Sequence, residues 1–223
     1  MRHNPASLVK RPGVRRQEAR HLDASTVSAV LKAAEGLRYQ QVLVLIAATG
    51  LRRGEALGLR WEHVNFKDGS VKVANTVGRV CNELVITEPK SQRSRRTVPL
   101  SPAVVSLLKA HRATQAVERL QAGNHWTDTG LVFTTEFGGP VDPRNLLRTI
   151  EIAANKAGVE NVGVHTLRHS AAVAWLEAGV HIKAVADLLG HSSISITGDI
   201  YGHTSDATTR AAIDGLSGAL GLR

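Results

Sequence analysis

Apolar residues recur along most of the chain at the three- and four-residue spacing of helices that bury one face. The first such stretch follows the candidate caps Asp23 and Ser25, runs through Val27 to Ala34 and stops at Gly36. The same spacing predicts helices at residues 38–48, 53–59, 102–120, 142–157, 165–178, 182–189 and 208–220. The chain is therefore predicted to be mainly α-helical.

The pattern changes between Val64 and Pro99, where β-branched residues gather in short runs bounded by turn residues. These runs cover residues 63–66, 70–77 and 84–87. They predict one small antiparallel sheet, followed by a loop that carries several basic residues. The predicted fold class is thus mainly α with a small antiparallel β-sheet, an α+β arrangement.

Composition narrows the class of protein. The longest apolar run, Val42 to Ala48, is far shorter than the roughly 18 residues that a membrane span needs, and no apolar signal core follows the basic N-terminus. Cys81 is the only cysteine, which excludes an internal disulfide and a cysteine-rich zinc site. We therefore expect a cytoplasmic, nucleoid-associated protein with no membrane partner.

The positive charge is concentrated at one end of the chain. The formal net charge is +9, and residues 1–20 contribute more than half of it, with six basic side chains against Glu18. Because this segment also holds Pro5, Pro12 and Gly13 and shows no apolar period, it is interpreted as a linker or extended arm. It could contact DNA or remain a solvated arm.

Four separated motifs could carry chemistry. In the first, Arg52 follows a predicted helix end and Glu55 comes three residues later, close enough to pair with it. A guanidinium binds a phosphate through two donors and keeps its charge, although such a pair could also be a surface salt bridge.

In the second motif, Lys90 lies in a loop or at a hairpin tip, where it could donate a proton to bound DNA or simply be solvated.

The third motif places His165 and Arg168 on one side of a predicted helix, beside its apolar stripe. A zinc site built from His165, His169, His191 and His203 is an alternative, but no His-Glu-x-x-His pattern is present. In the fourth motif, His191 is followed ten residues later by Tyr201. A tyrosine alone is more often a core or interface residue than a nucleophile.

Taken together and in this order, the motifs resemble the tyrosine recombinase, or phage integrase, family. The resemblance extends over about residues 21–205. The matching segments are 49–59, 88–100, 165–170 and 188–203. It implies a tyrosine recombinase catalytic-domain fold for residues 21–223, preceded by the basic linker 1–20.

The resemblance implies that Arg52 and Arg168 bind the non-bridging oxygens of the scissile phosphate and that Lys90 protonates the leaving 5′ oxygen. Fixed cations suit this reaction, because the transition state spreads negative charge over the equatorial oxygens. No metal or other cofactor is then needed. Further DNA contacts are predicted from the arm and the basic loop: Arg15, Arg16, Arg93, Arg95 and Arg96.

The remaining site residues are also assigned by the resemblance. His165 and His191 would stabilise the phosphorane-like transition state or carry the nucleophile's proton, and Glu55 would orient the arginine site. Tyr201 would attack the phosphorus and form a 3′-phosphotyrosyl bond. The only other tyrosine, Tyr39, falls inside a predicted helix.

The expected function is site-specific DNA recombination, the integration or excision of a phage or other mobile element. The alternatives are a type IB topoisomerase, which would relax DNA without recombining it, and a DNA-binding regulator without catalysis. The expected partner is double-stranded DNA, with a tetramer on DNA, a monomer in solution, and accessory directionality or DNA-bending proteins. Residues 204–223 would pack on a neighbouring protomer, and nothing before residue 20 could form the N-terminal DNA clamp of full-length members.

Overall fold

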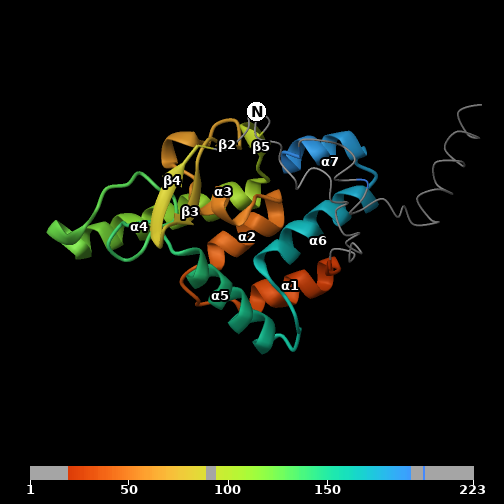
Figure 1. The fold of residues 1–223 in the computed structure, drawn as a ribbon, viewed down its shortest axis with the longest axis horizontal. Coiled ribbons are helices and arrows are strands. Elements are labelled where there is room, and N and C mark those ends of the chain that lie inside the picture. Colours follow the sequence, from red (N-terminus) through yellow and green to blue (C-terminus); the bar gives the residue numbers. More distant parts are fainter. Residues whose placement is uncertain (1–19, 89–93, 192–197, 199–223) are drawn as a thin grey trace, which may run out of the picture.

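The computed structural model describes residues 20–88, 94–191 and 198. In this part of the chain, helices make up most of the regular structure (Figure 1). The α-helices are α1 (Ala24–Ala33), α2 (Gln40–Thr49), α3 (Arg53–Leu57), α4 (Pro102–Ala122), α5 (Pro143–Lys156), α6 (Val164–Glu177) and α7 (Ile182–Leu189). Each corresponds to a helix predicted from the apolar spacing. The predicted helix 208–220 lies outside the described residues.

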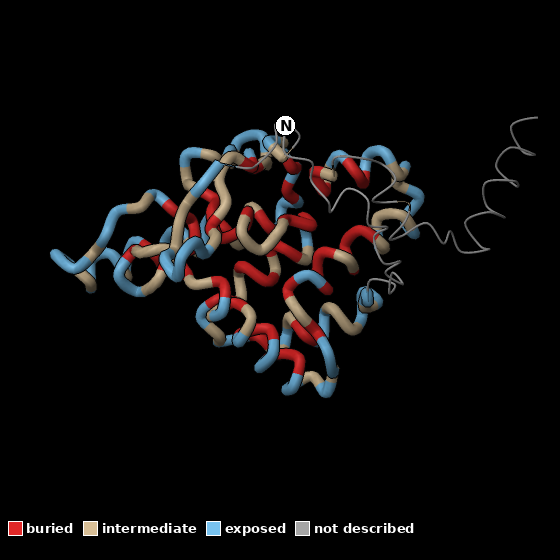
Figure 2. The backbone as a smooth tube through the Cα atoms, in the orientation of Figure 1, coloured by how far each residue is buried: buried red, intermediate tan, exposed pale blue. Residues whose placement is uncertain are grey.

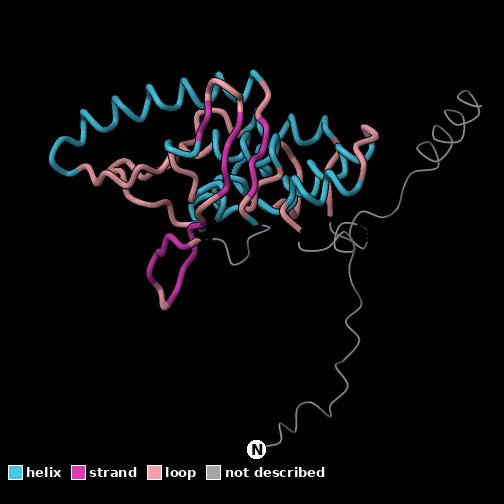
Figure 3. The backbone as a smooth tube through the Cα atoms, turned by 90° about the horizontal axis from the view of Figure 1, so that it is seen from above, coloured by secondary structure: helices cyan, strands magenta, loops and turns pink. Residues whose placement is uncertain are grey.

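The strands form two antiparallel sheets rather than the single sheet predicted. They are β1 (Val64–Asn65), β2 (Ser70–Val73), β3 (Thr76–Val80), β4 (Glu83–Thr87) and β5 (Arg96–Pro99). One sheet has the order β1-β2-β5, and β3 pairs only with β4. The predicted strand 70–77 is in fact two strands, and β5 begins within the predicted basic loop. The β3–β4 hairpin stands out from the body in Figure 3.

The core is organised around α2, where half of the residues are buried. Figure 2 colours the backbone by this burial. Val42, Leu43, Leu45 and Ile46 are completely buried. This is why the sequence of α2 is apolar almost throughout, since a helix that buries nearly every face has no need of a wide polar stripe. The helix contacts α1, α4, α5 and α6.

A second, smaller apolar cluster joins α6 to α7 through Ala172, Val185 and Leu189. The end of α2 lies against this cluster at Gly50, which has a left-handed φ of +63°. A Cβ atom at Gly50 would meet Leu189 Cδ2 at 2.9 Å. Glycine thus allows the end of α2 to approach α7 closely.

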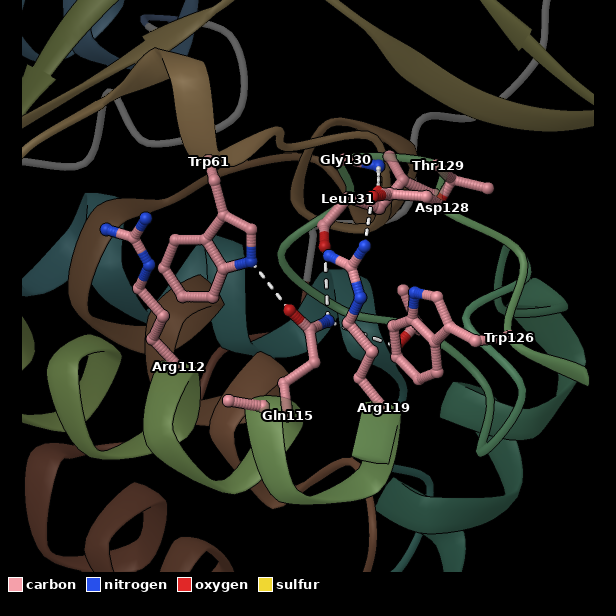
Figure 4. A pocket seen from close by; sticks show the side chains of 11 residues that line it. Trp61, Arg112, Gln115, Arg119, Trp126, Asp128, Thr129, Gly130 and Leu131 are labelled. Atoms are coloured by element: carbon pink, nitrogen blue, oxygen red, sulfur yellow. Dashed lines mark hydrogen bonds and ion pairs between the residues drawn. The ribbon is translucent and has the colours of Figure 1, made fainter. Parts of the chain in front are cut away.

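The far half of α4 is held by a buried amide. Gln115 Nε2 donates to the carbonyl oxygen of Val132 at 2.9 Å. Gln115 Oε1 accepts from Trp61 Nε1 at 2.7 Å (Figure 4). Gln115 therefore ties α4 to the chain segments before β1 and after residue 130. Among the described residues, no helix is long and apolar enough to cross a membrane.

Candidate active site

Arg52 and Glu55 form the first part of the site, at the N-terminus of α3. The Glu55 carboxylate accepts from the Arg52 backbone N–H at 2.9 Å and from Arg52 Nη1 at 2.7 Å. The Arg52 side chain remains 37% exposed, whereas that of Glu55 is 4% exposed. The carboxylate therefore holds a guanidinium that can still reach a ligand.

Arg96 is the second cation on Glu55. Its Nη2 lies 2.9 Å from Glu55 Oε2, and its side chain is 8% exposed. Burial alone would raise the pKa of the Glu55 carboxyl, but the hydrogen bonds and charges of Arg96 and Arg52 outweigh it and lower the pKa below its usual range. The structure thus places Arg96 inside the site on β5, whereas the sequence predicted a DNA contact in the basic loop.

Arg168 approaches the same place from α6. Its Nη1 donates to the carbonyl oxygen of Gly50 at 2.5 Å, and its Nη2 donates to that of Leu189 at 2.8 Å. Nη2 also lies 3.0 Å from His191 Nε2. Arg168 therefore joins the C-terminal ends of α2 and α7, where helix dipoles favour a cation.

The pKa of His191 is lowered to about 4 by partial burial and then by the charges of Arg168, Arg52 and Arg96. His165, near the start of α6, also has a lowered pKa, caused by desolvation and then by Arg53, Arg168 and Arg52. Both imidazoles are thus neutral at pH 7.

A cavity of about 490 Å³ opens beside Arg52 and His165. Its walls come from α3, β3 and the N-terminal ends of α5 and α6. Three further arginines line it: Arg53, Arg79 and Arg144. The cavity is therefore strongly cationic.

One acidic side chain, Asp142, partly offsets this charge. Arg79 Nη2 lies 2.6 Å from Asp142 Oδ2. The backbone N–H of Arg144 and then the charge and hydrogen bond of Arg79 lower the pKa of Asp142 below its usual range. Asp142 is also the N-cap of α5, so one carboxylate starts the helix and fixes Arg79.

This arrangement is suited to binding and activating a phosphodiester. Arg52, Arg168 and Arg96 supply fixed positive charge, and His165 and His191 supply neutral imidazoles. Preorganised cations and donors of this kind stabilise the charge that develops on a phosphoryl group without a change of protonation state. Within residues 20–88 and 94–191, no three His, Cys, Asp or Glu side chains lie close enough to hold a metal ion.

A family model described as the phage integrase family matches residues 20–208, which is most of the chain. The chain belongs to the phage integrase family. Membership confirms the resemblance seen in the four sequence motifs. It also accounts for their order along the chain.

Relatives within the family include recombinases and integrases of bacteria. A tyrosine recombinase XerC-like protein of Caldanaerobacter subterraneus subsp. tengcongensis is 37% identical over 77% of this chain and 47% of its own length. An integrase of Saccharopolyspora erythraea is 28% identical over 88% of this chain and 57% of its own length. The chain thus spans about half the length of these relatives.

Solved structures show that the fold is that of a family catalytic domain. The XerA recombinase matches with a TM-score of 0.67 at 24% identity, covering 88% of this chain and 65% of that one. The catalytic domain of bacteriophage HP1 integrase matches with a TM-score of 0.58 at 20% identity, covering 88% of this chain and 95% of that one. The predicted fold class, mainly α with small antiparallel sheets, is confirmed.

Several predicted site residues of this phage integrase family member lie outside the described residues: Lys90, Tyr201, Arg15, Arg16, Arg93 and His203. Lys90 belongs to the connection between β4 and β5, while the tip of the β3–β4 hairpin is at Cys81 and Asn82. Arg95 is exposed and pairs with Glu88. The other tyrosine, Tyr39, is buried at the start of α2.

Three arginines of the site were not predicted from the sequence, and a fourth, Arg96, was predicted only as a DNA contact. Arg53, Arg79 and Arg144 are far apart in the chain, so only the fold brings them to one cavity. A signal for Arg96 does exist. It shares the strand β5 with Val98 two residues later, and residues two apart face the same side of a strand, so buried Val98 predicts an inward Arg96.

Proposed function

We propose that this chain is the catalytic domain of a site-specific DNA recombinase that cleaves and rejoins DNA through Tyr201. The observation that carries the proposal is the convergence of Arg52, Arg168 and His191 on the end of α7. Tyr201 comes twelve residues after Leu189, the last residue of this helix. Integration or excision of a mobile element is the expected use.

In the proposed reaction, the phenolic oxygen of Tyr201 attacks the phosphorus and the bond to the 5′ oxygen breaks. Arg52 and Arg168 neutralise the non-bridging oxygens, and Lys90 donates a proton to the leaving 5′ oxygen. The phenol has an ordinary pKa of about 10, so nearby cations favour its ionised form, and a neutral His165 can take its proton while His191 stabilises the transition state. A 5′ hydroxyl of another strand reverses the step, because the tyrosyl ester conserves the bond energy.

Double-stranded DNA is the proposed substrate and partner. The cationic cavity beside Arg52 supports this, since a DNA backbone presents phosphates at regular intervals to fixed arginines. Related proteins have been solved on DNA: a Tn1549 transposon integrase with circular intermediate DNA is 20% identical with a TM-score of 0.74, covering 91% of this chain and 68% of that one. The XerH site-specific recombinase has likewise been solved bound to its difH substrate, before and after cleavage.

Assembly and organisation are further parts of the proposal. Residues 1–20 would act as a basic arm, residues 21–223 as the catalytic domain, and residues 204–223 as a segment that packs on a neighbouring protomer. The active assembly would be a tetramer on DNA, formed from monomers. Accessory proteins would set direction, and the protein would associate with the nucleoid.

The decisive experiment traps the covalent intermediate on a nicked suicide duplex, from which the cleaved strand end diffuses away. Tyr201→Phe should abolish trapping, and the matched control Tyr39→Phe should retain it, because Tyr39 is buried in the core. Equal trapping by Tyr201→Phe would sink the assignment. Relaxation of supercoiled DNA without any recombination between cognate sites would favour the topoisomerase alternative.

A further inference from the structure

Three arginines from three elements donate hydrogen bonds to the C-terminal end of α7. Arg96 comes from β5, Arg168 from α6 and Arg52 from the N-cap of α3. Their acceptors are the consecutive carbonyl oxygens of residues 188–190, at 2.6, 2.8 and 3.0 Å in that order. The last carbonyl groups of a helix have no donor within the helix, and they lie at the negative end of the helix dipole. Guanidinium groups supply both the hydrogen bonds and the positive charge that this end favours.

Two of these arginines were already assigned to the phosphate, but Arg96 differs from them. It is almost fully buried and both oxygens of Glu55 accept from it, Oε1 at 3.1 Å and Oε2 at 2.9 Å. Arg52 binds the same two oxygens from the other side, through Nη1 and its backbone N–H. Glu55 therefore bridges a buried arginine and an accessible one.

We infer that Arg96 is a positioning residue of the recombination site, which fixes Glu55 and the end of α7 so that Arg52 and His191 face one phosphate. This inference rests on the proposed function. Arg96 acts through other residues and does not itself touch DNA. The role contrasts with that of its neighbour Arg95, which is exposed and paired with Glu88.

The backbone next to Arg96 supports this role. Gly190 ends α7 with a left-handed φ of +65°, and a Cβ atom there would lie 2.7 Å from Arg96 Nη1. The chain turns from α7 toward His191 at the residue that Arg96 packs against. A displaced Arg96 would therefore move both the carboxylate that holds Arg52 and the start of the segment that carries His191.

Lysine cannot replace this arginine. Arg96 uses Nε on Leu188 and both Nη atoms on Glu55, a planar fork that a single ammonium group does not reproduce. Arg96→Lys keeps the charge, so it isolates geometry from electrostatics. A shift of about 1 Å in catalytic groups can slow a reaction about a hundredfold.

The test measures single-turnover formation of the covalent complex at saturating suicide duplex, and DNA affinity separately. Arg96→Lys should cleave ten- to a hundredfold more slowly, on the order expected for displaced groups, with DNA affinity within about twofold of wild type. Arg119→Lys is the control and should cleave at the wild-type rate, because Arg119 is exposed, pairs with Asp128 and takes no part in the site. A wild-type cleavage rate for Arg96→Lys, or a loss confined to DNA affinity, would overturn the inference.

A double-mutant cycle between Arg96 and Glu55 provides a second measurement if a single variant folds poorly. Glu55→Gln together with Arg96→Gln removes both buried charges, so neither is left without its partner. If Arg96 acts through Glu55, the double variant should cleave no more slowly than the slower single variant. Multiplied losses would contradict a shared role. A wild-type protein that forms no covalent complex would instead refute the proposed function.

Discussion

Nη2 of Arg168 lies 3.0 Å from Nε2 of His191, and this contact fixes the tautomer of the imidazole. A guanidinium can only donate, so Nε2 must accept and the ring proton must be on Nδ1. Partial burial and then the charges of Arg168, Arg52 and Arg96 lower the pKa of His191 to about 4. The site therefore presents a neutral histidine among arginines.

We predict that His191 stays neutral in the folded protein down to about pH 5, since its pKa lies near 4. Its ring nitrogen chemical shifts should keep the pattern of an Nδ1-protonated neutral imidazole as the pH is lowered from neutral to that point. Arg168→Gln should raise the pKa of His191, because it removes the nearest positive charge. A wild-type His191 that titrates at its ordinary pKa of about 6.5 or above would contradict the assignment.

The lowered pKa also predicts acid sensitivity. An unfolded histidine binds a proton near pH 6.5, whereas folded His191 does so only near pH 4, so the unfolded state takes up more protons in this window. The free energy of unfolding should be unaffected by this group above about pH 6.5 and should fall as the pH is lowered toward 4. Denaturant titrations at neutral pH and at about pH 5 should show a smaller loss for His191→Gln than for wild type.

Gly190→Ala should disturb the site without changing any charge. A left-handed alanine costs about 1–2 kcal/mol, and its Cβ would also push against Arg96. Gly179→Ala is the matched control, because Gly179 has a φ of +81° and a Cβ atom there would have no neighbour within 4 Å. Both variants should lose stability in denaturant titrations, and only Gly190→Ala should lose cleavage activity. Equal cleavage by the two variants would mean that Arg96 is not displaced.

The helices were predictable because each buries one face or, for α2, nearly every face, and this leaves a periodic apolar signal. The arrangement of the sheets could not be predicted in this way. The apolar pattern is a local signal, whereas strand pairing joins residues that are far apart in the chain. Residues 70–77 look like one β-branched run, yet β2 pairs with β5 and β3 pairs with β4. A change of partner within a run leaves no trace in the apolar pattern.

The same difference between local and long-range contacts applies to the residues of the site. Arg52 and Glu55 were found together because they are three residues apart, and the structure pairs them at 2.7 Å. The sequence identified Arg96 as a basic residue but not as a buried one, because its burial depends on Glu55 and on the end of α7. Carbonyl oxygens that orient the arginines belong to the backbone, so no residue type marks them.

Gln115→Leu should destabilise the fold far from the site. The amide side chain is buried and bonded at both ends, so leucine leaves Trp61 Nε1 and the carbonyl oxygen of Val132 without this partner. The expected loss is about 1–3 kcal/mol in the free energy of unfolding. Gln121→Leu, at an exposed position of the same helix, should change it by less than about 0.5 kcal/mol. Similar losses for the two would contradict the role of the buried amide.

The cationic cavity predicts which arginines set the salt dependence of DNA binding. Replacing Arg53 or Arg144 with glutamine should reduce the slope of log affinity against log salt by about 0.9 for each phosphate that is no longer neutralised. Arg79→Gln should reduce it less, because Arg79 is already paired with Asp142. Lys156→Gln is the control: Lys156 is exposed near the opposite end of α5 from Arg144, about 18 Å along the helix. Fluorescence anisotropy on a labelled duplex at several salt concentrations gives the slopes. If Lys156→Gln lowers the slope as much as Arg144→Gln, the phosphates do not follow this cavity.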